Sequence, residues 1–393
     1  MTPEMPSRSP EPGATPRYRR IVAKFGTNLL TSGGERLDPA VLASLVAQVA
    51  ALRRAGVEML VVTSGAIAAG RDVLGGEGKR KDIPYNQMLA AVGQGRLMQQ
   101  YSELFAGHGL HVAQALITKA DLDNREGYLN VRNTLEGLLE LGIVPIINEN
   151  DVVDIREIGG AVFGDNDRLS AAVANLVDAD LLAILSDIDG LFTADPRTDA
   201  AARLIPRVER IDAAIESLAG GVGSQRGRGG MAAKVDAAKM AVASGIPVIV
   251  ANGHTANVLA RLAEGEAIGT LFAPARSKVG SRQRWMVAGL SAHGAIVVDD
   301  GAARALGAQN KSLLPAGVQA VEGAFARGDL VEIRDARGTR LGRGLTNYSA
   351  ADLEKIKGAR SADIGRLLGY AYGDEVVHRN DLVLLTEQGA ATG

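Results

Sequence analysis

The sequence contains no cysteine among its 393 residues. That absence excludes a disulfide scaffold, a thiolate metal site and a cysteine nucleophile. An excess of one charge is also lacking, because 43 Lys and Arg stand against 45 Asp and Glu. The near-neutral balance argues against a chain that binds nucleic acid or membranes through overall positive charge. Apolar residues make up 46% of the chain, which predicts a globular protein.

Long apolar runs are missing as well. No run approaches the ~18 residues that a membrane span needs. The first residues lack the apolar stretch of a secretory signal peptide. We therefore expect a soluble, cytoplasmic protein. Residues 1–18 are rich in Pro, Ser, Glu and Arg and are expected to form a disordered tail.

Strand and helix patterns alternate over residues 19–273. The helical spacing is clear at Leu42, Leu45, Val46 and Val49, which share one face of a helix. Near-continuous apolar runs, suited to strands buried on both faces, occur at Ile21–Phe25, Val57–Thr63, Val112–Thr118, Val144–Asn148, Leu181–Leu185 and Pro247–Ala251. This alternation predicts an α/β domain with an open, mostly parallel sheet sandwiched by helices.

The alternation of strand and helix patterns ends near residue 274. Residues 274–284 are polar and basic, contain Pro and Gly, and are interpreted as a linker. Residues 285–386 predict a small β-rich domain, and residues 387–393 a tail. The strand candidates of the second domain, separated by Gly-rich turns, are Ala295–Val298, Leu330–Arg334, Thr339–Gly344 and Asp381–Thr386.

The common nucleotide-binding motifs are absent. There is no G-x-x-x-x-G-K-[ST] loop, and no G-x-G-x-x-G follows the first strand. Protein-kinase signatures are also missing. Several expected strands nevertheless end in turns made of Gly, Ser, Thr, Asn and Asp. Because ligands bind beyond the carboxyl ends of strands in open α/β sheets, we expect a site there.

Two lysines are candidates to contact a phosphate. Lys24 lies in an apolar strand, where a buried ammonium is costly unless it faces an anion. The alternative is a lysine that reaches solvent from the sheet edge. Lys234 lies in the first turns of a helix after a Gly-rich segment, where an ammonium opposes the helix dipole. An anionic ligand would offset that cost; the alternative is a solvated lysine beside a surface loop.

Polar residues also follow two other expected strands and precede one expected helix. Ser64 precedes a helix N-terminus, either as a ligand contact or as a plain N-cap. Asp151 belongs to a dense polar cluster that is able to bind an ammonium group, or to a solvated turn. Asp165 and Asp167 flank Asn166 before a helix. One carboxylate suffices for an N-cap, so the pair predicts a role beside a phosphate, with water-bound Mg²⁺ or with cationic side chains.

Together, and in this order, the motifs resemble the amino acid kinase family over about residues 19–386. The N-terminal motifs that carry the resemblance are KFGTN, VTSGAIAAGRDVLG, AAVGQGRLMQ, INENDVV, GDNDRLSA, GLFTADPR and GGMAAKVDAA. Within the family they resemble the branch that phosphorylates L-glutamate. The C-terminal motifs SLLPAGV, GAFARGD and LGYAYGDEVVHRNDLVLL resemble a PUA domain. The family usually has Ser where this chain has Asn28.

The resemblance implies ATP-dependent phosphorylation of the γ-carboxylate of glutamate, the first step of proline biosynthesis. Lys24 and Lys234 would contact the transferring phosphoryl group, and Asp167 would orient these lysines, with the catalytic residue Asp165 beside it. Glutamate would be bound by Ser64, Asp151 and Asn166. The residues implied to bind ATP are Lys24, Ser186, Asp187, Arg228, Gly229, Gly230, Met231, Ala232, Ala233 and Lys234. Mg²⁺ would be held mainly by the ATP phosphates, without a dedicated protein site.

The resemblance also implies a homo-oligomer, either dimer or tetramer, with proline as a feedback inhibitor and a glutamyl phosphate reductase as a partner. Residues 285–386 carry equal numbers of basic and acidic side chains, so RNA binding through this domain is not expected. Two alternatives stay open. One is another acylphosphate- or carbamate-type kinase of the same family, and the other is an RNA-binding protein that acts through the second domain.

Overall fold

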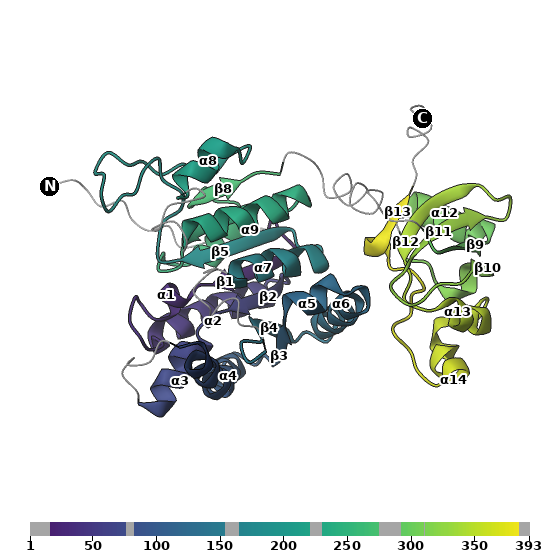
Figure 1. The fold of residues 1–393 in the computed structure, drawn as a ribbon, viewed down its shortest axis with the longest axis horizontal. Helices are drawn as coiled ribbons and strands as arrows, with labels where there is room; N and C mark the ends of the chain where they lie inside the picture. The colour runs from purple at the N-terminus through teal and green to yellow at the C-terminus, as the bar shows by residue number, and fades with distance from the viewer. Residues whose placement is uncertain are drawn as a thin grey trace.

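A computed structural model of the chain describes residues 16–75, 82–153, 165–220, 230–274, 292–309 and 311–384. The chain folds around two separate sheets (Figure 1). The expected tails and linker lie outside the described residues, apart from residues 16–18 and 274.

The first sheet has eight strands in the order β3-β4-β2-β1-β5-β7-β8-β6. All neighbouring strands are parallel except β7 and β8, which confirms the expected mostly parallel sheet. The strands are β1 (Arg20–Phe25), β2 (Glu58–Thr63), β3 (Val112–Ile117), β4 (Val144–Glu149), β5 (Leu181–Ser186), β6 (Arg207–Val208), β7 (Val248–Asn252) and β8 (Thr270–Phe272). The sequence did not predict β6 and β8, which are the shortest strands.

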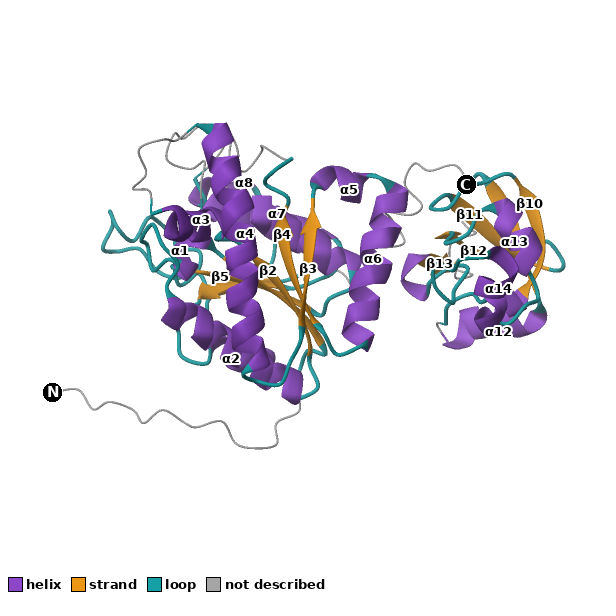
Figure 2. Cartoon of the chain, turned by 90° about the horizontal axis from the view of Figure 1, so that it is seen from below, coloured by secondary structure: helices purple, strands orange, loops and turns teal. Residues whose placement is uncertain are grey.

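Helices cover both faces of this sheet, and each face has its own apolar core (Figures 1 and 2). The helices packed on one face are α1 (Thr27–Leu30), α2 (Pro39–Arg54), α3 (Ala66–Leu74), α4 (Ile83–Ala106) and α10 (Val258–Ala263). Those on the other are α5 (Lys119–Asp123), α6 (Arg125–Glu140), α7 (Asp165–Leu176), α8 (Ala213–Leu218) and α9 (Met231–Ala243). None of the helices in these described ranges is both long and apolar enough to cross a membrane.

Side-chain alternation along β1 decides where Lys24 points. Ile21, Ala23 and Phe25 enter the core under α1 to α4, whereas Val22 enters the core under α7 and α9. Because successive side chains in a strand point to opposite faces, Lys24 lies on the same face as Val22. The fold therefore directs this lysine toward α7 and α9.

The second sheet has five strands in the order β10-β9-β11-β12-β13, with β9 and β11 parallel and the other pairs antiparallel. Its strands are β9 (Gly294–Val298), β10 (Val318–Gly323), β11 (Leu330–Asp335), β12 (Arg340–Leu345) and β13 (Leu382–Leu384). The sequence did not predict β10. Three helices also belong to this domain, namely α12 (Asp300–Gln309), α13 (Ala350–Ile356) and α14 (Ile364–Leu368). The chain thus folds as an α/β domain with a core on each face of its sheet, followed by a smaller domain with its own mostly antiparallel sheet and its own core.

The second domain contacts the first through α6 (Figure 2). Arg132 on this helix is only 1% exposed, and its guanidinium contacts the carboxylate of Asp381 and the Nδ1 atom of His378. Three further contacts, at 3.2, 2.6 and 2.7 Å, join Arg125 to Asp329, Arg327 to Asn130, and Asn133 to the carbonyl of Tyr372. Polar contacts along one helix therefore hold the two domains together.

Candidate active site

The carboxyl ends of four neighbouring strands lie side by side in the first sheet. The order β4-β2-β1-β5 is parallel throughout, so the residues that end these strands meet at one edge. Lys24, Ser64 and Ser186 come from three of these ends, and the loop with Asp151 follows the fourth. The helices α7 and α9 add their first turns on one face. The predicted strand-end site is therefore a real assembly of side chains.

Lys24 and Lys234 converge on one carboxylate. The Nζ atom of Lys24 lies 2.6 Å from Oδ1 of Asp167, and that of Lys234 lies 3.2 Å from Oδ2. The three residues are 5%, 6% and 1% exposed, respectively. Neither lysine reaches solvent, so the alternatives of a sheet-edge lysine and a solvated loop lysine are wrong. The carboxylate of Asp167 is engaged with the lysines, which argues against an N-cap role.

Burial and charge shift the pKa values of this cluster in a predictable way. Burial raises the pKa of the Asp167 carboxyl, but the two lysines outweigh it and hold that pKa below its usual range. For Lys234 burial is the larger effect, and it lowers the pKa of the ammonium despite the attraction of Asp167. The site thus keeps an ionised carboxylate beside an ammonium that loses its proton more easily than an ordinary lysine.

Ser64 and Asn166 join across the site. The Nδ2 atom of Asn166 donates a hydrogen bond to Oγ of Ser64 at 3.2 Å, and the two residues are 2% and 4% exposed. The N-cap of α3 is Gly65, whose φ of 102° is a left-handed conformation that glycine adopts freely. Ser64 is therefore not the N-cap, and its hydroxyl faces α7. Because Asn166 precedes Asp167, this pair borders the lysine cluster.

The polar side chains at the end of β4, and that of Asp151 in the turn after it, are buried. Asn148, Glu149 and Asp151 are 1%, 4% and 7% exposed. The backbone N–H of Glu149 donates to Oδ1 of Asn148 at 2.9 Å. A solvated turn would expose these side chains, so that alternative is wrong. Glu149 and Asp151 instead place two buried carboxylates at this end of the sheet.

Helix α4 supports this loop through two amides that the sequence analysis missed. Nδ2 of Asn148 donates to Oε1 of Gln94 at 2.9 Å. Nε2 of Gln87 donates to the carbonyl of Val152 at 3.0 Å. The two glutamines are seven residues apart, which is two turns of one helix face. That spacing was the available signal, but amides on a helix usually indicate a solvated surface.

The end of β5 forms the neighbouring part of the site. Ser186 is 5% exposed, and its hydroxyl donates to Oδ1 of Asp187 at 2.9 Å. Nδ2 of Asn28 donates to the other oxygen of Asp187 at 3.3 Å. The side chain that departs from the family pattern therefore contacts a predicted nucleotide ligand. Asp187 itself is exposed, as a residue at the mouth of a site would be.

The N-terminus of α9 brings the remaining predicted nucleotide ligands. Gly230 is its N-cap with a φ of 95°, and Met231, Ala232 and Ala233 are half-buried in its first turn. Nζ of Lys234 also donates to the carbonyl of Gly230 at 3.2 Å, which ties the lysine to this turn. The predicted ligands that lie outside the described residues are Arg228 and Gly229, together with the side chain of Asp165, the first residue of α7.

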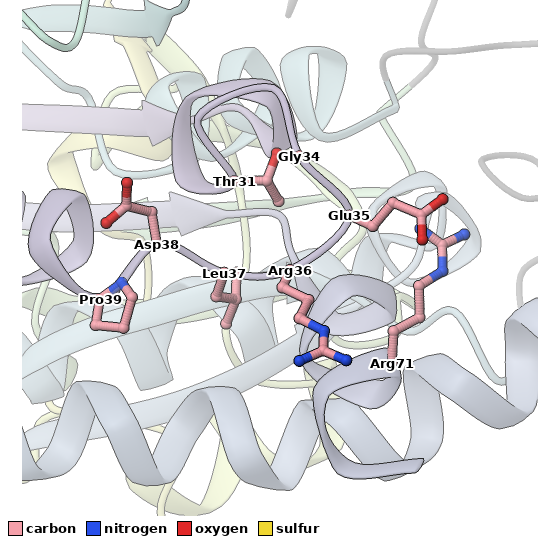
Figure 3. Close-up of a pocket in the computed structure, with 8 residues that line it drawn as sticks. All are labelled: Thr31, Gly34, Glu35, Arg36, Leu37, Asp38, Pro39 and Arg71. Carbon is pink, nitrogen blue, oxygen red and sulfur yellow. The ribbon is translucent and has the colours of Figure 1, made fainter. Parts of the chain in front are cut away.

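A cavity of about 550 Å³ lies elsewhere, beside α1 and the end of α3 (Figure 3). Thr31, Arg36 and Arg71 line it with residues of the loop between α1 and α2. It contains none of the predicted site residues. Over the described part of the chain, no three His, Asp or Glu side chains come together as a metal site.

Comparisons with known proteins match both parts of the chain. The Amino acid kinase family matches residues 19–252, and the PUA domain matches residues 294–368. A glutamate 5-kinase of Dehalococcoides mccartyi strain CBDB1 is 53% identical over 94% of this chain and 99% of its own length. A glutamate 5-kinase of Shewanella amazonensis is 50% identical over 95% of this chain and 98% of its own.

A solved UMP kinase from Bacillus anthracis covers 66% of this chain and 97% of its own, at 16% identity and a TM-score of 0.45, which is too low to define the fold. The family match and the two relatives do not depend on it. A match over more than half of the residues, with relatives of this identity and coverage, decides the classification. The chain belongs to the amino acid kinase family and carries a C-terminal PUA domain.

Proposed function

We propose that this chain transfers the γ-phosphoryl group of ATP to the γ-carboxylate of L-glutamate. The products are L-glutamyl 5-phosphate and ADP, and the reaction opens proline biosynthesis. The relatives named above are glutamate 5-kinases over nearly their whole length. The observation that carries the proposal is the convergence of Lys24 and Lys234 on Asp167 at the strand ends.

The chemistry needs charge neutralisation more than a base. The γ-carboxylate of glutamate is already ionised at neutral pH, so no side chain has to remove a proton from it. Phosphoryl transfer then depends on positioning and on cations beside the transferred group. Lys24 and Lys234 supply two such cations, and Asp167 holds them in place. Asp165 stays a predicted partner of this group.

The acceptor is proposed to lie between β2, β4 and α7. Ser64 and Asn166 offer a hydroxyl and an amide beside the lysines. Asp151 offers a buried carboxylate, which is the group that an α-ammonium pairs with. On this proposal, a zwitterionic amino acid lies with its side-chain carboxylate toward the lysines and its ammonium toward Asp151.

The nucleotide is proposed to lie along β5 and the N-terminus of α9, in contact with Ser186, Asp187 and residues 228–234. The free N–H groups at the start of α9 and the positive end of its dipole favour phosphate there. Mg²⁺ carried by the ATP phosphates would supply further positive charge to the transferred group. The ion needs few protein ligands, because magnesium in kinases binds largely through phosphates and water.

We further propose a cytoplasmic enzyme that forms dimers or tetramers, is inhibited by proline and hands its product to a glutamyl phosphate reductase. An acyl phosphate is reactive toward water, so an enzyme that consumes it nearby suits the chemistry. These proposals rest on the resemblance to the glutamate 5-kinases alone.

An ADP-release assay with purified protein tests the function. Glutamate, N-acetylglutamate, aspartate and carbamate are compared as acceptors with ATP and Mg²⁺. We expect turnover with glutamate far above the other three. Turnover only with one of the others would assign the chain to a different kinase of the family.

Asp151→Ala tests the acceptor pocket. Loss of a charged partner costs about 1.5–3 kcal/mol, so KM for glutamate should rise roughly tenfold or more. The KM for ATP should change little, since Asp151 is not among the proposed nucleotide ligands. An unchanged KM for glutamate would place its ammonium elsewhere.

A further inference from the structure

We propose that Gln94 is a specificity-determining residue of the acceptor site, whose side-chain N–H donates to the α-carboxylate of the amino-acid substrate. The proposal rests on the proposed function, because it names the substrate group that this side chain recognises. The first observation behind it is a series of hydrogen bonds at the end of β4.

These hydrogen bonds determine which atom is the oxygen and which is the nitrogen in two side-chain amides. The backbone N–H of Glu149 donates to Oδ1 of Asn148, so Nδ2 of Asn148 must be the donor on its other side. Nδ2 meets Gln94, whose facing atom is therefore the acceptor Oε1. The remaining atom of the Gln94 amide, Nε2, is a donor.

Nε2 of Gln94 is buried, and it finds no hydrogen-bond acceptor among the residues that the structure describes. A buried polar group without a partner costs free energy, so few such groups persist without a reason. A ligand that brings an acceptor to this position removes the cost.

The position lies between two parts of the acceptor site. On one side, Asn148 ends β4 three residues before Asp151. On the other, Gly93 packs against the first turn of α3, so closely that a Cβ on it would lie 1.8 Å from the carbonyl oxygen of Ala66. Ala66 comes two residues after Ser64. Gln94 is therefore held next to both the Ser64 turn and the Asp151 loop.

The chemistry of the substrate matches these two neighbours. Glutamate carries an ammonium and a carboxylate on one carbon atom, and Asp151 is already proposed for the ammonium. The α-carboxylate accepts hydrogen bonds only, so it needs donors a few ångströms from Asp151. Gln94 supplies such a donor, and its own orientation is locked by Asn148.

The Gln94→Glu substitution distinguishes a direct contact with the substrate carboxylate from a purely structural role of Gln94. A carboxylate at this position still accepts from Nδ2 of Asn148, but it replaces the donor with a group that repels the substrate carboxylate. KM for glutamate should rise about tenfold to a hundredfold, as for loss of a hydrogen bond to a charged group. The KM for ATP should stay near the wild-type value. A wild-type KM for glutamate in this variant would overturn the proposal.

Inhibition constants of two analogues give an independent measurement with Gln94→Ala. Glutarate keeps both carboxylates, whereas 4-aminobutyrate lacks the α-carboxylate. The substitution should weaken glutarate and leave 4-aminobutyrate unchanged. Equal weakening of both would mean that Gln94 acts only through the shape of the site, which would overturn the proposed contact.

Gln99→Ala is the matched control on the same helix. Gln99 is exposed and pairs with Glu103 at 2.8 Å, so its loss should leave every kinetic constant unchanged. Thermal unfolding of each variant checks that the fold is intact. If the wild type turns over glutamate and the Gln94 variants match it, only the role of Gln94 fails. If the wild type does not use glutamate, the proposed function fails first.

Discussion

Asp167 divides its two oxygens between Lys24 and Lys234, so one side chain sets the position of both cations. All three groups are almost fully buried, which strengthens their interactions because little water screens them. Each lysine therefore has a defined location before any substrate is present. That pre-organisation is what phosphoryl transfer requires.

Lys234→Ala should lower kcat about a hundredfold to a thousandfold, because preorganised charge on the transferring group is lost. Lys239→Ala is the control, since Lys239 lies on the same helix but is exposed and pairs with Glu216 at 2.5 Å. Steady-state kinetics and circular dichroism provide the measurement. Near-normal kcat in Lys234→Ala would remove this lysine from the mechanism.

The lowered pKa of Lys234 predicts a pH effect on the free enzyme. Because burial favours the neutral amine, Lys234 loses its proton below the ordinary lysine value of ~10.4. The ammonium is the useful form, so kcat/KM for ATP should fall as pH rises through this lowered pKa. A pH profile measured at constant ionic strength checks it. A profile that stays flat up to the ordinary lysine range would contradict the prediction.

Much of this site was predictable from residue types at strand ends. Lys24 in an apolar strand and Lys234 near a helix start both required an anion, and the structure brings them together. Gln94 was not predictable, because an amide on a helix usually lies on the solvated face and its sequence neighbours do not reveal that its Nε2 atom is buried. The hydrogen bond from Asn28 to Asp187 was not predictable either, since the two residues lie far apart in the sequence.

At the level of elements, α3 packs closely against α4. Gly93 meets the backbone of α3, and a Cβ on it would lie 2.3 Å from the nitrogen of Gly70. Gly95 on the same helix has open space around it. Close packing therefore requires a glycine at position 93, whereas the space around position 95 would accept a side chain.

Gly93→Ala should lower the free energy of unfolding by about 1–3 kcal/mol, and by more if the helices cannot separate, because a methyl group enters occupied space. Gly95→Ala should instead stabilise the helix by about 0.5–1 kcal/mol. Urea unfolding of the two variants gives both values. Equal effects in the two variants would mean that α3 and α4 do not approach so closely.

The main strands were predictable because they are buried on both faces and form near-continuous apolar runs. The strands β6, β8 and β10 were not predicted. Two or three residues show no period in β6 and β8, and only Val318 of β10 is fully buried. Tertiary pairing, which the sequence does not reveal locally, creates such strands.

At the scale of the whole molecule, α6 contributes both to the core of the first domain and to the junction between the domains. Leu135 and Leu139 enter the core beside Ile147 of β4, whereas Arg132 reaches the second domain. Gly328 approaches the start of this helix so closely that a Cβ on it would lie 3.0 Å from Cβ of Arg125. The second domain thus rests on the helix that leads into the acceptor strand.

Arg132→Leu should weaken this junction by about 3–5 kcal/mol, because it leaves the buried carboxylate of Asp381 without that cation. Calorimetry should then show the two domains unfolding in separate transitions. Arg125→Ala is the control, since its partly exposed pair with Asp329 is worth less than about 1 kcal/mol. An unchanged calorimetric profile for Arg132→Leu would show that the junction does not depend on this contact.

The sequence analysis did not predict this junction between the domains. Arg132 occurs in a helical pattern where an arginine normally indicates a solvated face, and its partners lie more than 240 residues away. The two-domain organisation, in contrast, was predicted from the change near residue 274, where alternating strands and helices give way to short strands and Gly-rich turns. The boundaries of the linker remain a prediction.

The lysine trio also has a consequence for the resting protein. Two cations and one anion leave a surplus of one positive unit in a place nearly free of water. On the proposed function, the phosphates of the nucleotide would bring negative charge to this cluster. Nucleotide should therefore act as a structural counter-ion as well as a reactant, and the protein should resist heat better when it is bound.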